Sequence, residues 1–557
     1  MVVLQKKTLI HGSFRHVSHK KEKAKGSSIL GTHGSFIHLA TVINIKKMKD
    51  YWHENSSPDR SDPVNRLAST RSSSSSYVGF DPMEGFARAT NMHGIGIGIG
   101  IGIGMPRDLQ ILTTVLALLI LSFTAAVPPP EPDPCAGRRI HVRRLPARFN
   151  TDLLRHCDGA FPLADHPSAT PSCASLANHG LGPRTHNLSR SWYRTDARLL
   201  EPLFHRRLLD RGACLADDPA RADAVFLPYY ASLDALPFLL DPAMLNLSAA
   251  HGAPLADFLK RDRPRILERR HGHDHFLVLA GPAWDYAQPP DTDPRLWGTT
   301  SLLRRPEFDN FTFLTLESRA WPWQEHAVPH PTSFHPSSLP RLRAWLARAR
   351  RSRRTALMLY AGAVSKPSRP NIRGSILAEC ANRTDRTCTV VDCSGGSCDL
   401  NPVRYMRAML KARFCLEPPG DTPTRRSTFD AIVAGCVPVF FENASARTQY
   451  GWHLPPGRYD EFSVTIPKDA VVLGGVQIAE TLAAVPEEEV TRMRERLLEL
   501  APRVVYRRHG SAAEGMGMDA ADIAVEGALR RIRRRVRALE DGQPEAMYAM
   551  DDDNQEI

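Results

Sequence analysis

Short apolar runs alternate along the chain with longer stretches in which apolar residues recur every three or four positions. The short runs are typical of buried parallel strands, and the longer stretches are typical of amphipathic helices. The pattern therefore predicts an α/β protein in two halves. Strands are expected at Arg139–Val142, Ala224–Pro228, His275–Leu279 and Thr312–Leu316 in the first half, and at Ala356–Ala361, Thr389–Val391, Arg413–Leu416 and Val437–Phe441 in the second.

The amphipathic stretches predict helices over Arg198–Arg211 and Leu339–Arg351, the second of them strongly basic and near the expected hinge between the halves. Helical patterns then continue over Glu487–Leu539. The last of these helices carries a run of arginines, Arg530–Arg537, beside apolar residues at helical spacing. We expect its apolar side to pack on the body and its basic side to be solvated, with a membrane-surface helix as the alternative.

One strand–loop–helix–strand unit is predicted over Lys411–Phe441. Its loop contains Pro418-Pro419-Gly420, after which Thr422 and Pro423 are expected to be the N-cap and the first residue of the helix. Gly435 is expected to end that helix. A parallel β-α-β unit of this kind offers an anion site at the carboxyl end of its first strand, because the N–H groups at the helix start point toward the ligand.

Two arginines, Arg425 and Arg426, stand at the predicted helix start. Their guanidinium groups suit a diphosphate, whereas the simpler interpretation is a surface helix with two solvated arginines. Their place between a Pro-Gly loop and a buried helix favours a nucleotide-diphosphate site, in which nearby hydroxyls donate further hydrogen bonds and a carboxylate accepts them from the ribose. The residues predicted to bind the nucleotide donor are Gly420, Arg425, Arg426, Ser427, Thr428 and Asp430. Ser427 and Thr428 supply the hydroxyls, and Asp430 accepts hydrogen bonds from the ribose.

Further distinctive segments surround this unit. They are LPARFN at 145–150, ADAVFLPYYASLD at 222–234, HDHFLVLAGPAWDY at 273–286, WGTTSLL at 297–303, PWQEHAVPHPTSFHP at 322–336, NIRGSI at 371–376 and TQYGWHLPPGRYDEFSVTIP at 448–467. Together with TRRSTFD at 424–430, they resemble the plant exostosin-like glycosyltransferases, in particular the xyloglucan galactosyltransferase branch, over nearly all of Arg139–Leu539. The resemblance implies a GT-B fold, in which two Rossmann-like domains face a cleft, and an inverting transfer from a UDP-sugar in the Golgi lumen.

The reaction that the resemblance implies is transfer of galactose from UDP-galactose to xylosyl side chains of xyloglucan, a hemicellulose of the cell wall. One alternative is another UDP-sugar, such as galacturonate or a pentose, on a wall polysaccharide. The other is an inactive relative that scaffolds a complex of Golgi glycosyltransferases. The chain departs from the family pattern at Arg143-Arg144, Gly281 and Gly362–Lys366, and these departures concern the acceptor and the donor more than the fold.

Inverting transfer needs a carboxylate or histidine that takes the proton of the acceptor hydroxyl, and this base is expected in the first half. Asp285 follows a predicted strand at the end where ligands of such sheets bind, and His330 and His335 lie in a Pro-rich loop before the hinge helix. Aromatic residues near these positions are candidates for sugar stacking or, as the simpler interpretation, for core packing. They are Trp284, Tyr286, Trp321 and Trp323.

No metal or other cofactor is expected. A metal-dependent transferase would carry a DxD motif at the end of an apolar strand, but Asp291-Thr292-Asp293 follows two prolines and precedes Pro294, which is typical of a turn. Four cysteines crowd one loop-like stretch, at Cys380, Cys388, Cys393 and Cys398. They lack a CxxC pair and a histidine at ligand spacing, so local disulfides are favoured over zinc. Cys415 and Cys436 lie on predicted buried strands and are expected to be core thiols.

The start of the chain differs in composition from the rest. Nine of the thirteen lysines lie in residues 1–104, which end in a Gly-Ile repeat and carry a net charge of +7 out of +12. The apolar stretch Leu109–Val127 has no charged residue and is long enough to span a bilayer. The basic residues before it favour a cytosolic N-terminus and a lumenal body. We expect translation from Met105 to give the functional protein, since the leader has no pattern that packs.

The region after the apolar stretch has features of a lumenal protein. All ten cysteines lie there, which suits an oxidising compartment. Five N-glycosylation sequons are present, at Asn187, Asn246, Asn310, Asn382 and Asn443. The body has a net charge of only +5 and no concentrated basic stripe with aromatics, so nucleic acid is not expected as a partner.

The expected protein is therefore a single-pass type II protein of the Golgi membrane. Its predicted organisation is a leader (1–104), a cytosolic tail (105–108), a signal anchor (109–127), a Pro-rich stem (128–138), an acceptor-side Rossmann-like domain (139–338), a nucleotide-sugar-binding domain (339–510), a C-terminal helix (511–540) and a disordered tail (541–557).

Overall fold

The computed structural model describes Asp108 and residues 133–547, with gaps at 156, 158–171, 186–189, 241–244, 290–299, 320–322, 365–370, 384–386, 395–396, 421 and 512–513. The leader and the predicted signal anchor at 109–127 lie outside the described residues. Among the helices that are described, none is both long and apolar enough to cross a membrane. The described residues from Cys135 onward pack into one unit, which contains two parallel sheets.

The first half, up to residue 338, contains a five-stranded parallel sheet whose strands lie side by side in chain order. The strands are β1 (Ile140–Val142), β2 (Ala224–Phe226), β3 (His275–Pro282), β4 (Thr312–Glu317) and β5 (Glu325–Ala327). β3 is buried along almost its whole length, as expected of a strand that is covered on both faces. The carboxyl ends of β3 and β5 lead into the segments that carry the predicted catalytic residues.

Helices cover both faces of this sheet. On one face, Phe276 and Val278 lie in the same hydrophobic cluster as residues of α4 (Leu200–Leu209) and α17 (Ala520–Glu540). On the other face, Leu277 and Leu279 cluster with residues from the stretch of short helices between β2 and β3. Successive side chains of β3 therefore point to opposite layers. The helices of that stretch are α5 (Ala231–Asp234), α6 (Leu236–Leu240), α7 (Ala253–Arg261) and α8 (Pro264–Glu268).

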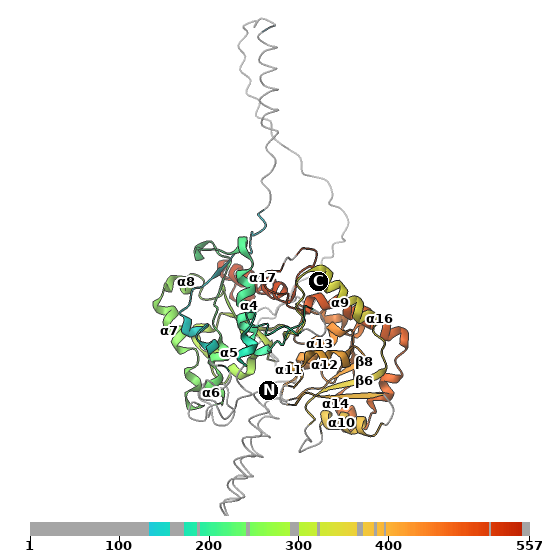
Figure 1. Ribbon diagram of the computed structural model, residues 1–557. Coiled ribbons are helices and arrows are strands. Elements are labelled where there is room, and N and C mark those ends of the chain that lie inside the picture. Colours follow the sequence, from blue (N-terminus) through green and yellow to red (C-terminus); the bar gives the residue numbers. More distant parts are fainter. Residues whose placement is uncertain are drawn as a thin grey trace, which may run out of the picture. The chain divides into compact units, whose positions relative to one another are not determined.

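The helix α17 returns from the end of the chain to pack on the first sheet (Figure 1). Arg531 Nη1 donates to the backbone oxygens of Gln324 and Glu325, at 3.4 and 3.3 Å. Arg535 Nη1 donates to Thr312 Oγ1 at 3.4 Å, and both arginines are buried. The expectation of a solvated basic face was therefore wrong for these two residues, because they reach the amino ends of β4 and β5. The apolar side of α17 lies in the core and is not available to a membrane.

The second half contains another five-stranded parallel sheet, with the strand order β10-β9-β8-β6-β7. The strands are β6 (Ala356–Gly362), β7 (Cys388–Asp392), β8 (Ala412–Glu417), β9 (Val437–Phe440) and β10 (Val464–Thr465). Numbered from the first strand of this half, the order is 2-1-3-4-5. In such a doubly wound sheet the connections diverge between strands 1 and 3, here β6 and β8, and ligands bind outside the carboxyl ends of the strands at this switch point.

The helices of the second half alternate with its strands, as the sequence pattern predicts. They are α9 (Leu339–Arg351), α10 (Ile372–Ala381), α11 (Ser397–Leu400), α12 (Pro402–Met409), α13 (Arg426–Ala434), α14 (Lys468–Val472), α15 (Ile478–Ala483) and α16 (Glu487–Val504). α13 follows β8 directly and is the helix on which the predicted donor site stands. At the end of the chain, a short helix α18 (Pro544–Met547) lies in the stretch predicted to be disordered.

The eight predicted strands are all present within three residues of their expected bounds. The sequence pattern missed β5 and β10, which have three and two residues and lie in Pro-containing stretches. It also placed the start of α13 too early. Pro423 is not helical, and the N-cap is Arg425, with φ −142° and ψ 141°. Gly435 ends the helix in the left-handed conformation, at φ 61°, as predicted.

All ten cysteines form disulfides. The pairs are Cys135–Cys214, Cys157–Cys173, Cys380–Cys388, Cys393–Cys398 and Cys415–Cys436. The predicted local pairing in the 380–398 stretch is confirmed. The prediction that Cys415 and Cys436 are free core thiols was wrong. These two residues lie on or beside the neighbouring strands β8 and β9, so the disulfide spans the β-α-β unit that carries the predicted donor site.

Candidate donor-binding site

The loop between β8 and α13 lies beside the switch point of the second sheet. Gly420 is in this loop, and a side chain there would collide with a terminal guanidinium nitrogen of Arg425. Arg425 is partly buried, and its Nη1 donates to Thr422 Oγ1 at 3.1 Å and to the Thr424 carbonyl at 2.5 Å. Glycine at position 420 therefore leaves the space that the Arg425 guanidinium occupies at the helix start.

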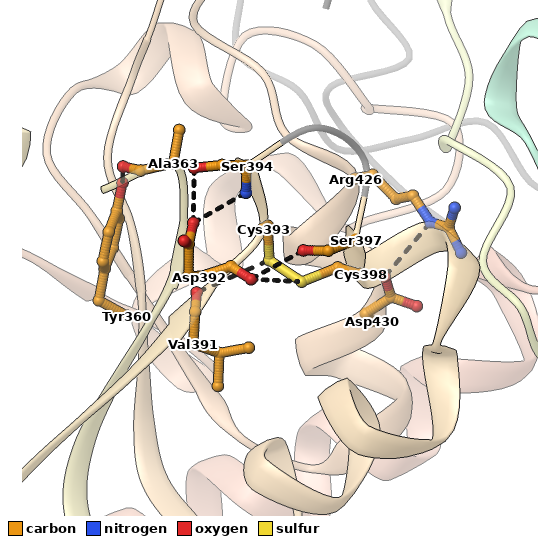
Figure 2. The surroundings of a disulfide bond; sticks show 10 residues. All are labelled: Tyr360, Ala363, Val391, Asp392, Cys393, Ser394, Ser397, Cys398, Arg426 and Asp430. Carbon is orange, nitrogen blue, oxygen red and sulfur yellow. Dashed lines mark hydrogen bonds and ion pairs between the residues drawn. A yellow bond between two sulfur atoms is a disulfide. The ribbon is translucent and has the colours of Figure 1, made fainter. Parts of the chain in front are cut away.

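Arg426 stands beside Arg425 but turns toward the first half. Its Nη1 donates to the Thr195 carbonyl and its Nη2 to Ser333 Oγ, both at 2.7 Å. Its Nε lies 3.4 Å from Asp430 Oδ2, a pair drawn in Figure 2 beside the disulfide Cys393–Cys398. The guanidinium of Arg426 thus connects α13 to two segments of the first half, whereas the sequence predicted a diphosphate contact for it.

The hydroxyls at the start of α13 are directed toward a buried carboxyl group. Ser427 Oγ donates to Glu417 Oε2, and Thr428 Oγ1 lies 3.5 Å from the same oxygen. Glu417 is the last residue of β8 and is 1% exposed. Burial, with a smaller contribution from the nearby Asp430 carboxylate, raises its pKa to about 8, so Glu417 is predominantly protonated at pH 7.

Asp430 is itself 2% exposed. It is not a solvated helix residue, and its burial leaves little carboxylate surface for the ribose hydroxyls that the sequence assigned to it. In the same way, the Thr428 hydroxyl is buried against Glu417 and does not face a diphosphate. Of the six predicted donor-binding residues, Gly420 and Arg425 remain candidates for contact with a diphosphate.

The carboxylate of Glu317 joins the donor loop to the first half. Glu317 is the last residue of β4 and is 2% exposed. Its Oε2 accepts from the Thr424 N–H at 2.9 Å and from Thr424 Oγ1 at 2.6 Å, and its Oε1 accepts from Trp284 Nε1 at 2.9 Å. The Thr424 N–H therefore has its partner in the first half of the chain, immediately before α13 begins. Sequence reasoning missed Glu317, although its place at the carboxyl end of a strand was a usable signal.

Two further contacts hold the halves together at the same place. Gln449 Oε1 accepts from the Ser318 N–H and Oγ, at 2.8 and 2.9 Å. Tyr450 donates from its hydroxyl to the Leu316 carbonyl at 3.1 Å. The carboxyl end of β4 therefore contacts both the donor loop and the segment after β9.

Among the predicted bases, His330 lies next to the donor loop. Its Nε2 is 3.3 Å from Thr424 Oγ1, and its ring stacks on Phe429 of α13 at a centroid distance of 5.9 Å. Burial and, to a smaller extent, the positive charges of Arg425 and Arg426 lower its pKa to about 3. His330 is therefore a neutral imidazole at pH 7. An anion bound to these arginines would offset their charge and make His330 a stronger base.

His335 lies in the core and is 0% exposed. Its Nδ1 is 2.6 Å from the Tyr506 carbonyl, which can only accept, so Nδ1 carries the proton. Its Nε2 is 2.8 Å from Thr195 Oγ1. Both ring nitrogens are used within the protein, and burial lowers the pKa to about 3. This geometry contradicts the prediction of His335 as a base and gives it a structural role.

Asp285 follows β3 in a short 3-10 helix, at the carboxyl end of the sheet as predicted. Its side chain is 5% exposed, and its backbone oxygen accepts from the Thr300 N–H at 2.7 Å. The preceding residue, Trp284, donates to Glu317 and so belongs to the chain of contacts that reaches the donor loop. Asp285 and His330 are thus the two base candidates near this junction.

The aromatic residues predicted to stack on sugars also differ in how far they are buried and in where they lie. Tyr286 is buried in the core, and its hydroxyl occupies the space that a side chain at Gly281 would need. Trp323 packs against Arg535, whose Cζ lies 5.1 Å from the ring centroid. Trp284 is only partly buried and is the sugar-stacking candidate that remains next to the junction. Trp321 lies outside the described residues.

The remaining predicted sites are partly described. The sequons at Asn382 and Asn443 have exposed asparagines, as a glycan requires, whereas Asn310 is partly buried and its Nδ2 donates to the His271 carbonyl at 2.8 Å. Asn187 and Asp291-Thr292-Asp293 lie outside the described residues, and the side chain of Asn246 is not described either. The four cysteines weighed as a zinc site are held in two disulfides.

Comparisons with known proteins agree on one family. Residues 134–482 match the exostosin GT47 domain. The chain is 57% identical over 408 residues to the probable xyloglucan galactosyltransferase GT19 of Arabidopsis thaliana, covering 72% of this chain and 92% of that protein. It is 34% identical over 427 residues to the xyloglucan galactosyltransferase MUR3 of the same plant, covering 76% and 67%. The xyloglucan-specific galacturonosyltransferase 1 of Arabidopsis thaliana is 32% identical over 403 residues, covering 72% and 58%.

Proposed function

The chain belongs to the exostosin GT47 family of glycosyltransferases, and from this we infer that it transfers galactose from UDP-galactose to xylosyl side chains of xyloglucan. The observation that carries the proposal is the 57% identity to GT19 over 92% of that protein's length, whose name states a probable xyloglucan galactosyltransferase. The reaction proceeds with inversion, as the resemblance to the family implies.

The fold that suits this function is GT-B, with the second half holding the nucleotide sugar and the first half the acceptor. Two parallel α/β sheets joined at the carboxyl end of β4, with the last long helix packed on the first sheet, support this assignment. The switch point of the second sheet, beside Arg425 and Gly420, is the proposed place of the diphosphate.

In the proposed reaction, a base removes the proton of a xylosyl hydroxyl while its oxygen attacks the anomeric carbon of galactose. The bond between that carbon and the diphosphate breaks from the opposite face, and UDP leaves with an additional negative charge. The Arg425 guanidinium and the N–H groups at the start of α13 stabilise this charge. Asp285 and His330 are the proposed bases, because both lie near the junction of the two halves.

The proposed location is the Golgi membrane, with residues 109–127 as the signal anchor and the body in the lumen. Five disulfides suit an oxidising compartment. The two exposed sequon asparagines support N-glycosylation at Asn382 and Asn443. A complex with other Golgi glycosyltransferases is part of the proposal.

A second donor is also proposed as an alternative. The galacturonosyltransferase among the relatives shares 32% identity with this chain, and its name states a different sugar for the same polysaccharide. Pentose transfer and an inactive scaffold are the remaining alternatives.

The test is a panel of UDP-sugars assayed against xyloglucan oligosaccharides, with the products identified by mass spectrometry. We expect a mass increase of one hexose with UDP-galactose. Transfer of a uronic acid or a pentose would favour the alternative donors. No product from any donor, with a folded and glycosylated protein, would favour the scaffold.

Chelation with EDTA should leave transfer largely intact. The reason is that an arginine side chain and a helix start, and not a DxD motif with its metal, are proposed to neutralise the diphosphate. The measurement is turnover before and after EDTA treatment, followed by addition of Mn²⁺. Loss of most turnover in EDTA and its return with Mn²⁺ would contradict the proposed site.

A further inference from the structure

The helix starts of α10 and α13 lie at the same edge of the second sheet. β6 and β8 are neighbouring parallel strands, with Tyr360 paired with Leu416 near their carboxyl ends. α10 follows β6 and α13 follows β8, so the two helices begin on either side of the switch point. The start of α10 is fixed by Asn371, whose side chain accepts from the Gly374 N–H at 2.9 Å.

Arg373, the second residue of α10, reaches from this helix start to Gly420. A Cβ atom at Gly420 would lie 2.5 Å from Arg373 Cζ and would collide with a terminal nitrogen of both Arg373 and Arg425. The two guanidinium groups therefore converge on the same glycine from two different helices. Tyr360, near the carboxyl end of β6, is close enough to both for their charges to act on its hydroxyl, although burial has the larger effect and raises its pKa.

The charge of Arg373 is not matched within the described part of the chain. Its guanidinium makes no hydrogen bond or ion pair with the described residues, and its Nε is buried. Glu417, which is close enough to Arg425 to be affected by its charge, has a pKa of about 8 and is predominantly neutral at pH 7. The guanidinium groups of Arg373 and Arg425 carry like charges and repel each other at this distance, whereas an anion bound between them attracts both.

We propose that Arg373 is a second donor-binding arginine and that it holds, together with Arg425, the diphosphate of the nucleotide sugar over Gly420. This inference rests on the proposed function and adds a residue that the sequence reasoning did not single out. It also assigns different roles to the two adjacent arginines of the donor loop. Arg425 binds the diphosphate with Arg373, whereas Arg426 joins the halves through Thr195 and Ser333.

The same geometry gives Gly420 a role in the proposed diphosphate site. Any side chain at this position occupies the space of both guanidinium groups and displaces them from their common ligand. Gly420→Ala is therefore a second variant that tests the site without removing a charge.

The experiment compares UDP binding by calorimetry in the wild type, Arg373→Ala, Gly420→Ala and the control Arg343→Ala, which changes an exposed arginine of α9 in the same half. We expect UDP affinity to fall roughly 10- to 100-fold in Arg373→Ala, as for the loss of a charge-assisted hydrogen bond, and to stay unchanged in the control. Gly420→Ala should weaken UDP binding to a similar degree. Uridine, which has no phosphate, should inhibit transfer equally in the wild type and in Arg373→Ala.

The outcomes separate this inference from the proposed function. UDP affinity that is equal in the wild type, Arg373→Ala and Gly420→Ala would overturn the inference and leave the proposed function standing. A wild type that neither binds UDP nor transfers sugar would overturn both. Melting temperatures of all variants are measured alongside, and a folded Gly420→Ala protein with weakened UDP binding supports the inference even where Arg373→Ala is unstable.

Discussion

Replacing Arg425 by alanine should remove most of the transfer activity while leaving the fold intact. The guanidinium is proposed to act on the bound diphosphate and again on the charge that develops as the glycosidic bond breaks. Removal of one such transition-state donor typically lowers the rate roughly 100- to 1000-fold. Arg425→Lys should rescue poorly, because an ammonium group is a point charge and cannot reproduce the guanidinium fork. Turnover, UDP affinity and melting temperature are the three quantities to compare.

Arg426→Ala is the variant to compare with Arg425→Ala, because the two adjacent arginines are assigned different roles. Its guanidinium donates to Thr195 and Ser333 of the first half. We therefore expect the alanine variant to lose stability as well as activity, whereas Arg425→Ala loses UDP affinity with little change in melting temperature. Wild-type UDP affinity in Arg425→Ala would remove the proposed donor site. Equal losses of UDP affinity at unchanged melting temperature in both variants would restore the forked pair that the sequence suggested.

The contrast between these arginines shows what a sequence pattern can determine. The strand, loop and helix over Lys411–Phe441 are specified locally, by an apolar run, two prolines, a glycine and helical spacing. β8, α13 and the left-handed Gly435 therefore appear almost where the pattern places them. The directions of adjacent side chains at the helix start are not local. Arg426 turns toward Thr195, 231 positions earlier in the chain.

The misplaced start of α13 has the same origin. Thr422 and Pro423 have the residue types of a helix start, and nothing near them in the sequence opposes that assignment. In the structure the Thr424 N–H donates to the carboxylate of Glu317, 107 positions away, a contact that no local pattern indicates. Arg373 was missed because its segment, NIRGSI at 371–376, was noted only for its resemblance to the family, and its place beside Gly420 depends on how the two helix starts pack. Local pattern thus predicts the elements, and packing between elements decides which of their polar groups face a ligand.

The disulfide between Cys415 and Cys436 extends this argument to covalent structure. Each cysteine lies in an apolar run and looks like an ordinary core residue by its neighbours. Their pairing follows from β8 and β9 being adjacent in the sheet, with Cys415 opposite Pro438 in the register. The prediction of local pairs in the 380–398 stretch succeeded because the sequence separations there, 8 and 5, are short.

Replacing Glu417 by glutamine should make the protein more stable at pH 8 and leave its stability at pH 5 nearly unchanged. The pKa of Glu417 is raised by burial from 4.5 to about 8 in the folded state, so the folded protein binds one more proton than the unfolded chain between these values. The stabilising contribution of the protonated form is fully present below pH 4.5 and is lost as the pH rises toward 8. Over the whole window the loss is roughly 5 kcal/mol for this one group.

Glutamine is the matched replacement because it stays neutral at every pH and keeps an oxygen that accepts from Ser427. Denaturant unfolding at pH 5, 6.5 and 8 measures the effect, and the free energy of unfolding of the variant should fall less steeply with pH than that of the wild type. Burial also raises the pKa of Glu201, which lies in the first half of the chain, to about 8. Glu201 is therefore the control site for the slope of the unfolding free energy against pH. Its carboxylate accepts from two backbone N–H groups, of Ser232 and Ala280, so Glu201→Gln should flatten the same curve without touching the donor loop.

Parallel curves for the wild type and Glu417→Gln would mean that Glu417 is ionised in the folded protein. Its negative charge would then stand beside Arg425, and the case for a bound diphosphate at that arginine would be correspondingly weaker.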